Sequence, residues 1–390
     1  MLQIALCHEN VLPSRGGAGM YVADLARRLA AAGHSVQLYA SRWDSGSLSP
    51  RVRVRPLPRV RGGRAFRPWR FSAIVQHALT RDRPDVSLGF DKTFGPDVYY
   101  PLGGLQPASA AHNIRKHRGS LMRFGARVAK ALDPVQWSYS RLERRWLLGP
   151  RPPLLVVNSQ WVREHAIRHY GFERDRVRVI PNAIDPSRFD ERDRGELRSA
   201  ERRRWGLGPS DVVAAFAAMN YRLKGLETLL RALARVPTFH PLKLLVAGSA
   251  AIEPWERLAR RLGVARRVAF VGPCGDIRRV YFASDFLVHP TFYDPCSGVV
   301  LEALACGLPA ITTRCNGAAE LIRPADAGIV LDDPRDDLAL ADALIAFADP
   351  VRRDLASRAA RQAAAAWTLD HHYAQWLELF EEVAASRRAA

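Results

Sequence analysis

The sequence predicts an α/β protein with parallel sheets in two domains. Its 390 residues exceed one ordinary domain and are enough to bury two hydrophobic cores. Short apolar runs that end in glycine or a polar residue alternate with amphipathic segments of helical period, a pattern typical of parallel strands joined by helices. The hydrophobic content of 48% and the charged content of 25% are those of a soluble globular protein.

A strand–helix–strand unit opens the chain. It consists of an apolar strand at 2–7, a glycine-rich turn at 13–17, a helix around 21–29 and a second strand at 35–39. The glycine spacing differs from the dinucleotide-binding motif, so NAD binding is not expected. Gly16 and Gly17 precede the helix. We expect their backbone to approach a substrate phosphate or sugar, unless they form only a tight turn.

The next segments lead to a candidate acid. A strand at 52–54, a helix around 71–79 and a buried strand at 85–90 precede a polar loop that ends at Asp97. Polar groups at the carboxyl end of a parallel strand face the ligand crevice in doubly wound sheets, so Asp97 is a candidate active-site acid. The alternative is a turn or cap residue, because an aspartate after Gly-Pro is common in turns.

Residues 112–151 differ in composition from the rest of the chain. Ten basic residues are accompanied only by Asp133 and Glu143, and they are interleaved with leucines and aromatic residues at helical spacing. This pattern is typical of a helix pair on an anionic membrane surface. An equally good interpretation is that the apolar face packs on the domain and the arginines are solvated.

The overall charge and the cysteines narrow the function classes. A net charge of +19 indicates a surface attracted to polyanions. Nucleic acid is not the expected partner, because the sequence has no aromatic–basic repeat. The five cysteines lack zinc-ligand spacing, so no metal is expected and the thiols indicate a reducing compartment. The chain opens on an apolar strand rather than a signal peptide and has no run of membrane-spanning length, which favours a cytoplasmic protein.

The strand that opens the second domain leads to two cations. The strands expected from here on are 154–158 and 177–180 in the first domain and 212–218, 242–248, 268–272, 285–290 and 310–313 in the second. Arg222 and Lys224 follow strand 212–218, immediately before a helix. Two cations at such a turn can neutralise a departing diphosphate, unless they belong to an ordinary surface turn.

The segment 292–309 contains the most distinctive pattern of the chain. Asp294 and Glu302 are separated by seven residues, and the small residues Ser297 and Gly298 with Val299 begin a helix between them. Unpaired N–H groups at such a helix start suit a diphosphate. Glu302 would then accept hydrogen bonds from a vicinal diol such as a ribose, and Asp294 would reach the group beyond the diphosphate. An ordinary helix N-terminus is the alternative.

This segment resembles the signature of the retaining glycosyltransferases of family 4, which have the GT-B fold of two facing Rossmann-like domains. The family pattern is Glu, seven residues, Glu, followed by Ala-x-x-x-Gly-x-Pro; Asp294 stands where the family has the first Glu. Further matches are Lys224-Gly225 and the interdomain segment 181–189. By this resemblance Asp294 contacts the donor sugar, Lys224 and Arg222 bind the diphosphate, and Pro273 lies near the nucleotide base.

Residues 89–99 resemble the bacterial lipopolysaccharide core glucosyltransferases of this family, with Asp97 at the position of their proposed acceptor-site acid. The resemblance implies a metal-independent hexosyltransferase that uses UDP-glucose and a glycolipid acceptor such as the inner-core heptose, at the cytoplasmic face of the membrane. It implies an acceptor domain at 1–181, completed by a returning C-terminal helix at 368–390, and a donor domain at 182–367. Another donor or acceptor, or a nucleotide-sugar epimerase of the same fold, remains open.

Overall fold

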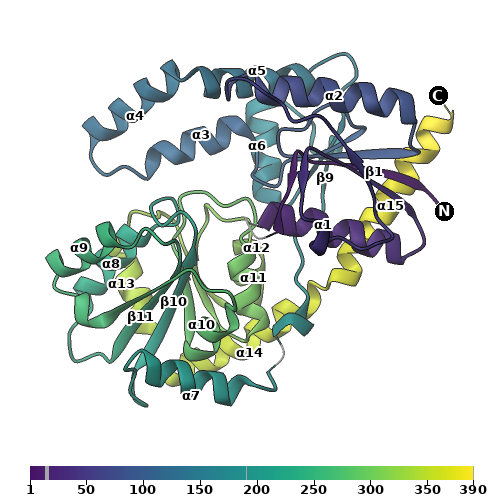
Figure 1. Ribbon diagram of the computed structural model, residues 1–390. Coiled ribbons are helices and arrows are strands. Elements are labelled where there is room, and N and C mark those ends of the chain that lie inside the picture. The colour runs from purple at the N-terminus through teal and green to yellow at the C-terminus, as the bar shows by residue number, and fades with distance from the viewer. Residues whose placement is uncertain (14–16, 190, 390) are drawn as a thin grey trace. The chain divides into compact units, whose positions relative to one another are not determined.

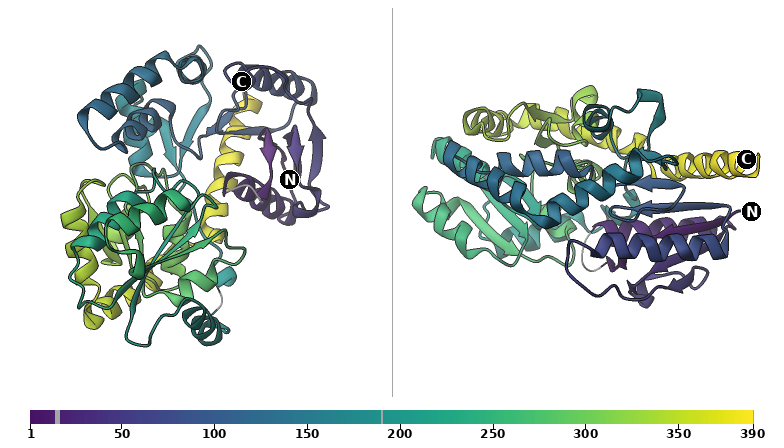
Figure 2. Two further views of the ribbon diagram at one scale, coloured as in Figure 1. Left: turned by 60° about the vertical axis from the view of Figure 1, so that its left-hand side comes forward. Right: turned by 90° about the horizontal axis from the view of Figure 1, so that it is seen from above.

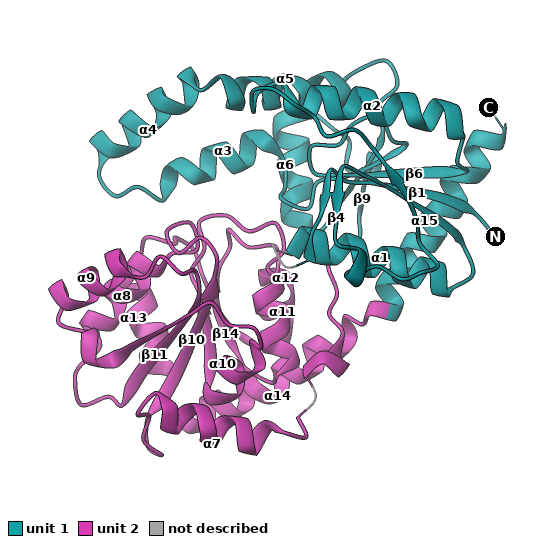
Figure 3. Cartoon of the chain, in the orientation of Figure 1, with its two compact units in different colours: residues 1–181, 370–390 teal, residues 182–369 magenta. Residues whose placement is uncertain are grey.

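The computed structural model describes residues 1–13, 17–189 and 191–389 (Figure 1). It divides into two compact units, residues 1–181 with 370–390 and residues 182–369 (Figure 3). Each unit has its own parallel sheet with helices on both faces (Figure 2). The predicted α/β fold with two parallel sheets is therefore confirmed.

The sheet of the first unit has seven strands in the order β5-β3-β1-β6-β7-β8-β9. Every pairing within it is parallel. The interior strand β1 is buried from Ile4 to Cys7, as expected for a strand covered on both faces. The strands are β1 (Gln3–Cys7), β3 (Ser35–Ala40), β5 (Arg53–Pro56), β6 (Val86–Phe90), β7 (Val98–Tyr100), β8 (Leu154–Val157) and β9 (Val177–Val179), with the separate pair β2 (Asn10–Val11) and β4 (Arg42–Trp43).

Helices complete the first unit. They are α1 (Gly17–Ala31), α2 (Arg67–Asp82), α3 (Gln106–Arg115), α4 (Ser120–Leu132), α5 (Pro134–Leu147), α6 (Gln160–Tyr170) and the C-terminal α15 (Leu369–Ala389). The helix pair expected at 112–151 is thus part of a run of three helices, α3 to α5, which begins earlier in the chain. α4 extends away from the sheet of its unit (Figure 1) and has no buried residue, whereas α5 buries Ser138, Leu142, Glu143 and Leu147.

The last helix, α15, packs against the first unit. Trp376 and Phe380 are fully buried in the core that also holds β1. His372 links α15 to the rest of the unit: Nδ1 donates to the carbonyl of Pro181 at 2.7 Å, and Nε2 accepts from the Tyr21 hydroxyl at 2.8 Å. Trp376 Nε1 also donates to the Tyr21 oxygen, at 2.9 Å. These bonds require a neutral His372, and burial lowers its pKa to about 4.

The second unit has a six-stranded parallel sheet in the order β12-β11-β10-β13-β14-β15. Its strands are β10 (Val212–Ala218), β11 (Leu242–Gly248), β12 (Val268–Gly272), β13 (Phe286–His289), β14 (Ala310–Thr313) and β15 (Gly328–Leu331). Its helices are α7 (Arg194–Arg204), α8 (Leu226–Arg235), α9 (Glu253–Arg261), α10 (Arg278–Ala283), α11 (Gly298–Ala305), α12 (Ala319–Ala325), α13 (Asp337–Ala346) and α14 (Pro350–Ala366). The carboxyl ends of parallel strands share one edge, so the loops after β10 and β13 meet there.

No described helix in either unit has the length and apolar character needed to cross a membrane.

The neutral His372 predicts a pH-dependent stability of the first unit. Because its folded pKa lies below the unfolded value, the unfolded chain binds more protons between about pH 6.5 and pH 4. Stability contributed by His372 is therefore complete above pH 6.5 and is lost as the pH falls toward 4, by up to about 3 kcal/mol. Urea unfolding across this range should show the loss in wild type and in the exposed-site control His371→Gln, but much less of it in His372→Gln. If the free energy of unfolding changed equally with pH in all three proteins, His372 would not be the source of the pH dependence.

Candidate functional site

Lys224 and Asp294 form an ion pair at the carboxyl edge of the second sheet. Lys224 lies on the loop between β10 and α8, and Asp294 on the loop between β13 and α11. The Lys224 ammonium donates to Asp294 Oδ2 at 2.6 Å and to the carbonyl of Tyr293 at 3.1 Å. Both side chains keep a small exposed fraction, 20% for Lys224 and 14% for Asp294. The pair is therefore held by the fold and still reachable by a ligand.

The surroundings of Asp294 keep it ionised. Burial alone would raise its pKa, but the charge of Lys224 and a hydrogen bond from His289 hold the pKa well below its ordinary value. His289 Nε2 lies 3.3 Å from Asp294 Oδ2, and burial lowers the pKa of this histidine. A neutral His289 with its proton on Nε2 therefore orients the carboxylate without adding charge. The sequence pattern at 285–290 predicted only a strand here and did not identify this role.

Backbone pairing fixes the loop that carries Asp294. Its N–H donates to the carbonyl of Cys315, and its own carbonyl accepts from Gly317 at 2.9 Å. The loop that carries Lys224 is tied to the same region, because the N–H of Phe292 donates to the carbonyl of Leu223 at 3.0 Å.

Gly225 allows this close approach. Its φ is +85°, and a Cβ there would overlap the carbonyl oxygen of Pro290. The position therefore requires glycine both for its conformation and for space.

The start of α11 offers backbone donors beside this pair. Gly298 is exposed, and a Cβ at its position would meet nothing within 4 Å. The first N–H groups of a helix have no partner inside the helix, so those of Gly298 and Val299 are suited to an anion. The N–H of Ser297, in contrast, donates to Asn316 Oδ1 at 3.2 Å and Ser297 is buried. The expected three donors are thus reduced to two.

Glu302 lies one turn into α11 and is held by Tyr281. The Tyr281 hydroxyl donates to Glu302 Oε2 at 2.8 Å. Burial raises the pKa of Glu302, and the bond from Tyr281 opposes that rise. One carboxylate oxygen is occupied by Tyr281, so the second is the one suited to a diol.

Arg222 and Pro273 make no described contact with Lys224, Asp294 or Glu302. Arg222 is exposed, and among the described interactions none joins it to Lys224, Asp294 or Glu302; its guanidinium lines a separate pocket between α8 and α9. Pro273 is exposed and directly follows Gly272 at the carboxyl end of β12. Its predicted place near a base remains a prediction.

Asp97 lies at the wrong edge of the first sheet for the predicted acid. It precedes β7 rather than following it, and β6 and β7 run parallel with Leu88 opposite Val98. Its carboxylate accepts from the N–H and hydroxyl of Ser87, at 2.9 and 2.6 Å, and from Arg387 at 2.8 Å. Asp97 therefore joins α15 to the amino edge of the sheet, so its assignment as an active-site acid was wrong.

The carboxyl edge of the first sheet carries other polar groups. His8 follows β1 and Asp91 follows β6, and the sequence analysis selected neither. Burial lowers the pKa of His8, so it is neutral near pH 7, while the charge of Asp91 opposes that shift. Both could have been found from one signal, because each directly follows a buried strand.

A pocket of about 490 Å³ at this edge includes His8, Gly17 and Arg42. Gly16 lies outside the described residues. Gly17 begins α1, and a Cβ at Gly19 would lie 2.8 Å from the backbone of Leu12, so the turn is close-packed there. In the described ranges, the structure has no group of three or more His, Cys, Asp or Glu side chains arranged to hold a metal ion.

Comparison with known families identifies both halves of the chain. A family model described as "Glycosyltransferase Family 4" matches residues 15–188, and one described as "Glycosyl transferases group 1" matches residues 210–349.

Individual relatives match over most of the chain. The lipopolysaccharide glucosyltransferase WaaG of Escherichia coli (strain K12) is 27% identical over 85% of each protein. A D-inositol 3-phosphate glycosyltransferase of Xylanimonas cellulosilytica is 30% identical over 96% of this chain and 93% of the relative. The crystal structure of WaaG matches with a TM-score of 0.76 at 26% identity, covering 93% of this chain and 95% of that one. The structural comparison and the sequence comparison therefore point to the same group of proteins, the glycosyltransferases.

Gly225 provides a test of the site geometry. Gly225→Ala should destabilise the second unit by about 2–4 kcal/mol, because it combines a positive φ with an overlap on Pro290. Gly263→Ala is the matched control, since Gly263 also has a positive φ, +73°, but open space around a Cβ. It should cost only about 1–2 kcal/mol. Urea unfolding of both variants measures the difference, and equal costs would show that the two loops are not pressed together at Gly225.

Proposed function

Because the chain belongs to glycosyltransferase family 4, we propose that it is a retaining hexosyltransferase that moves glucose from UDP-glucose to a glycolipid acceptor such as the lipopolysaccharide inner-core heptose. The observation that supports this most is the Lys224–Asp294 pair beside the free amides of α11, with Glu302 one turn further. A cation and two N–H donors suit a diphosphate, and carboxylates on either side suit a sugar and a ribose.

Each part of the UDP-glucose donor binds a different one of these groups. Lys224 and the amides of Gly298 and Val299 bind the diphosphate, Glu302 binds the ribose through its free oxygen, and Asp294 contacts the glucose. Arg222, which lines a different pocket, is left out of the diphosphate contacts. No metal takes part, because the charge that develops on the departing diphosphate is balanced by Lys224 and the helix start.

The reaction proceeds by attack on the face from which UDP departs. The bond from the anomeric carbon to the diphosphate oxygen breaks, the acceptor oxygen bonds to that carbon on the same face, and the departing oxygen takes the acceptor proton. The protein contributes positioning and charge stabilisation. His8 and Asp91, at the carboxyl edge of the first sheet, replace Asp97 as the groups that orient the acceptor.

Helix α4 supports an acceptor held at a membrane. Leu121, Phe124 and Leu132 follow one stripe of the helix, and their exposed fractions are 81%, 63% and 76%. Arg123, Arg127 and Lys130 lie on the opposite face. Such a helix suits the surface of an anionic bilayer, and we propose that this surface is the cytoplasmic face of the inner membrane.

A soluble phosphorylated acceptor is the second candidate. Arg42 lines the pocket beside Gly17, and no ion pair of its side chain occurs within the described ranges. A free guanidinium beside a helix start suits an acceptor phosphate. The relative from Xylanimonas cellulosilytica, named for D-inositol 3-phosphate, is consistent with such an acceptor.

Lys224 is the test of the donor assignment. Lys224→Met should lower kcat for glucose transfer from UDP-glucose by ~100-fold or more, because it removes a charge that stabilises the departing diphosphate. Lys243→Met is the matched control, since Lys243 lies on β11 and has no part in the site. Radiolabelled glucose transfer to deacylated inner-core lipopolysaccharide measures both, with circular dichroism to confirm folding. Turnover like that of wild type in Lys224→Met would contradict the assignment.

The membrane proposal predicts binding that depends on both faces of α4. Arg123→Gln with Arg127→Gln should weaken binding to phosphatidylglycerol vesicles about 30-fold, at ~1 kcal/mol for each basic residue. Leu121→Ser with Phe124→Ser should also weaken it. Arg352→Gln with Arg358→Gln, on the exposed surface of α14, removes equal charge and serves as the control. If co-sedimentation depends only on total charge, or is equal for zwitterionic vesicles, α4 is not the membrane-binding element.

A further inference from the structure

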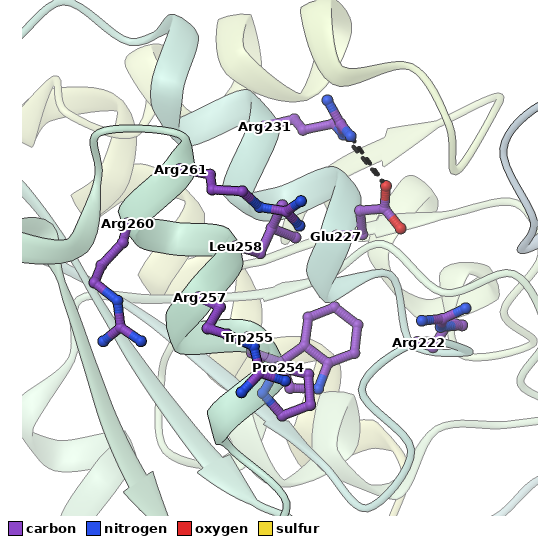
Figure 4. A pocket seen from close by; sticks show the side chains of 9 residues that line it. All are labelled: Arg222, Glu227, Arg231, Pro254, Trp255, Arg257, Leu258, Arg260 and Arg261. Atoms are coloured by element: carbon purple, nitrogen blue, oxygen red, sulfur yellow. Dashed lines mark hydrogen bonds and ion pairs between the residues drawn. The ribbon is translucent and has the colours of Figure 1, made fainter.

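The second unit carries a pocket that the donor assignment does not use. It has a volume of about 550 Å³ and is lined by residues of α8, α9 and the loop before α8 (Figure 4). This volume is in the range of small-molecule sites. Five of its lining residues are arginines: Arg222, Arg231, Arg257, Arg260 and Arg261.

Most of this positive charge is not neutralised. Glu227 is the only carboxylate in the lining, and it pairs with Arg231 at 3.2 Å. The acids in the first turn of α9, Glu253 and Glu256, are not part of the lining. Among the described ion pairs, none involves the other four arginines. Repulsion between like charges in a concave surface disfavours the empty pocket and favours an anion.

The pocket also has an apolar part. Trp255 and Leu258 line it, and both are half-buried against the core of the unit. Trp255 is held edge-to-face by Tyr221, with ring centroids 6.0 Å apart, and the Tyr221 hydroxyl donates to the carbonyl of Ser249 at 3.2 Å. A fixed aromatic ring beside several guanidinium groups suits a phosphate attached to a sugar or another ring, since guanidinium forks bind phosphate oxygens in pairs.

We propose that this pocket is a binding site for a phosphate group of a small phosphorylated molecule other than the nucleotide-sugar donor. Arg222 belongs to this site, whereas Lys224, on the same loop, turns to Asp294. The proposal does not depend on the proposed transferase reaction. The same phosphate chemistry occurs in soluble sugar phosphates and in phospholipid headgroups, and the test below separates these sources.

Calorimetric titration with inorganic pyrophosphate in the presence of saturating UDP tests the site, because UDP fills the proposed diphosphate site at Lys224. The triple variant Arg257→Gln, Arg260→Gln and Arg261→Gln should weaken binding at least about 100-fold, because each lost contact is a hydrogen bond to a charged group. The matched control carries Arg266→Gln, Arg352→Gln and Arg358→Gln, which remove the same charge from exposed positions of the second unit outside the pocket. The control should bind as wild type does.

Vesicles of phosphatidylglycerol form the second arm, in a Leu121→Ser and Phe124→Ser background that weakens any binding through α4. If the triple variant loses pyrophosphate binding but still binds vesicles, the ligand is a soluble phosphate. If it loses vesicle binding but still binds pyrophosphate, the ligand is a lipid headgroup. Thermal unfolding confirms that the variants are folded. If wild type binds neither probe, or if the triple variant and its matched control are equally affected, the arginines are a solvated surface and the proposal is wrong.

Discussion

Asp294 is fixed at the edge of the second sheet by its ion pair with Lys224, and the other groups of the proposed donor site depend on the two loops that carry these residues. The loops meet because their strands are parallel and end at the same edge. Gly225 allows the contact, since any side chain there would overlap Pro290. α11 begins directly after the Asp294 loop, so the backbone bonds of that loop to Cys315 and Gly317 also determine where its free amides lie.

The contacts of Asp294 hold a carboxylate in place where the family 4 pattern has a glutamate. The carboxylate of Asp294 is shared by Lys224 and His289, at 2.6 and 3.3 Å. His289 is buried at the end of β13, whereas Lys224 is half-buried on the loop before α8. A short side chain loses less conformational entropy when it is fixed than a glutamate does. The remaining exposed part of Asp294 is small, so a sugar bound as we propose would have to approach the carboxylate closely.

The parts of the fold that follow from local pattern were predictable from the sequence. Apolar runs such as 212–218 and 242–248 correspond to β10 and β11 residue for residue. The Asp294–Glu302 spacing correctly placed both acids around the start of a helix. Asp97 was misassigned because its role depends on whether it precedes or follows a strand, and a three-residue strand such as β7 has too little periodicity to show its direction.

Contacts between distant segments were not predictable. The hydrogen bonds between His289 and Asp294, between Tyr281 and Glu302, and between Asn316 and the N–H of Ser297 are examples. None of these pairs has a sequence signature. The exposed face of α4 is a similar case, since the sequence left open whether its apolar stripe packs on the domain, and only the burial of each side chain distinguishes α4 from α5. The diphosphate contact of Arg222 stays a prediction: the side chain lines the pocket between α8 and α9, and its proximity to Lys224 in the sequence does not determine which way it turns.

The most direct measurement compares UDP-glucose and UDP binding to wild type and to Asp294→Asn by calorimetry. Asp294 is assigned to the sugar and not to the nucleotide, so the variant should bind UDP-glucose at least about tenfold more weakly while its affinity for UDP is unchanged. Equal losses for both ligands would place Asp294 at the diphosphate or in a purely structural role. That result would contradict a donor site organised around the Lys224–Asp294 pair.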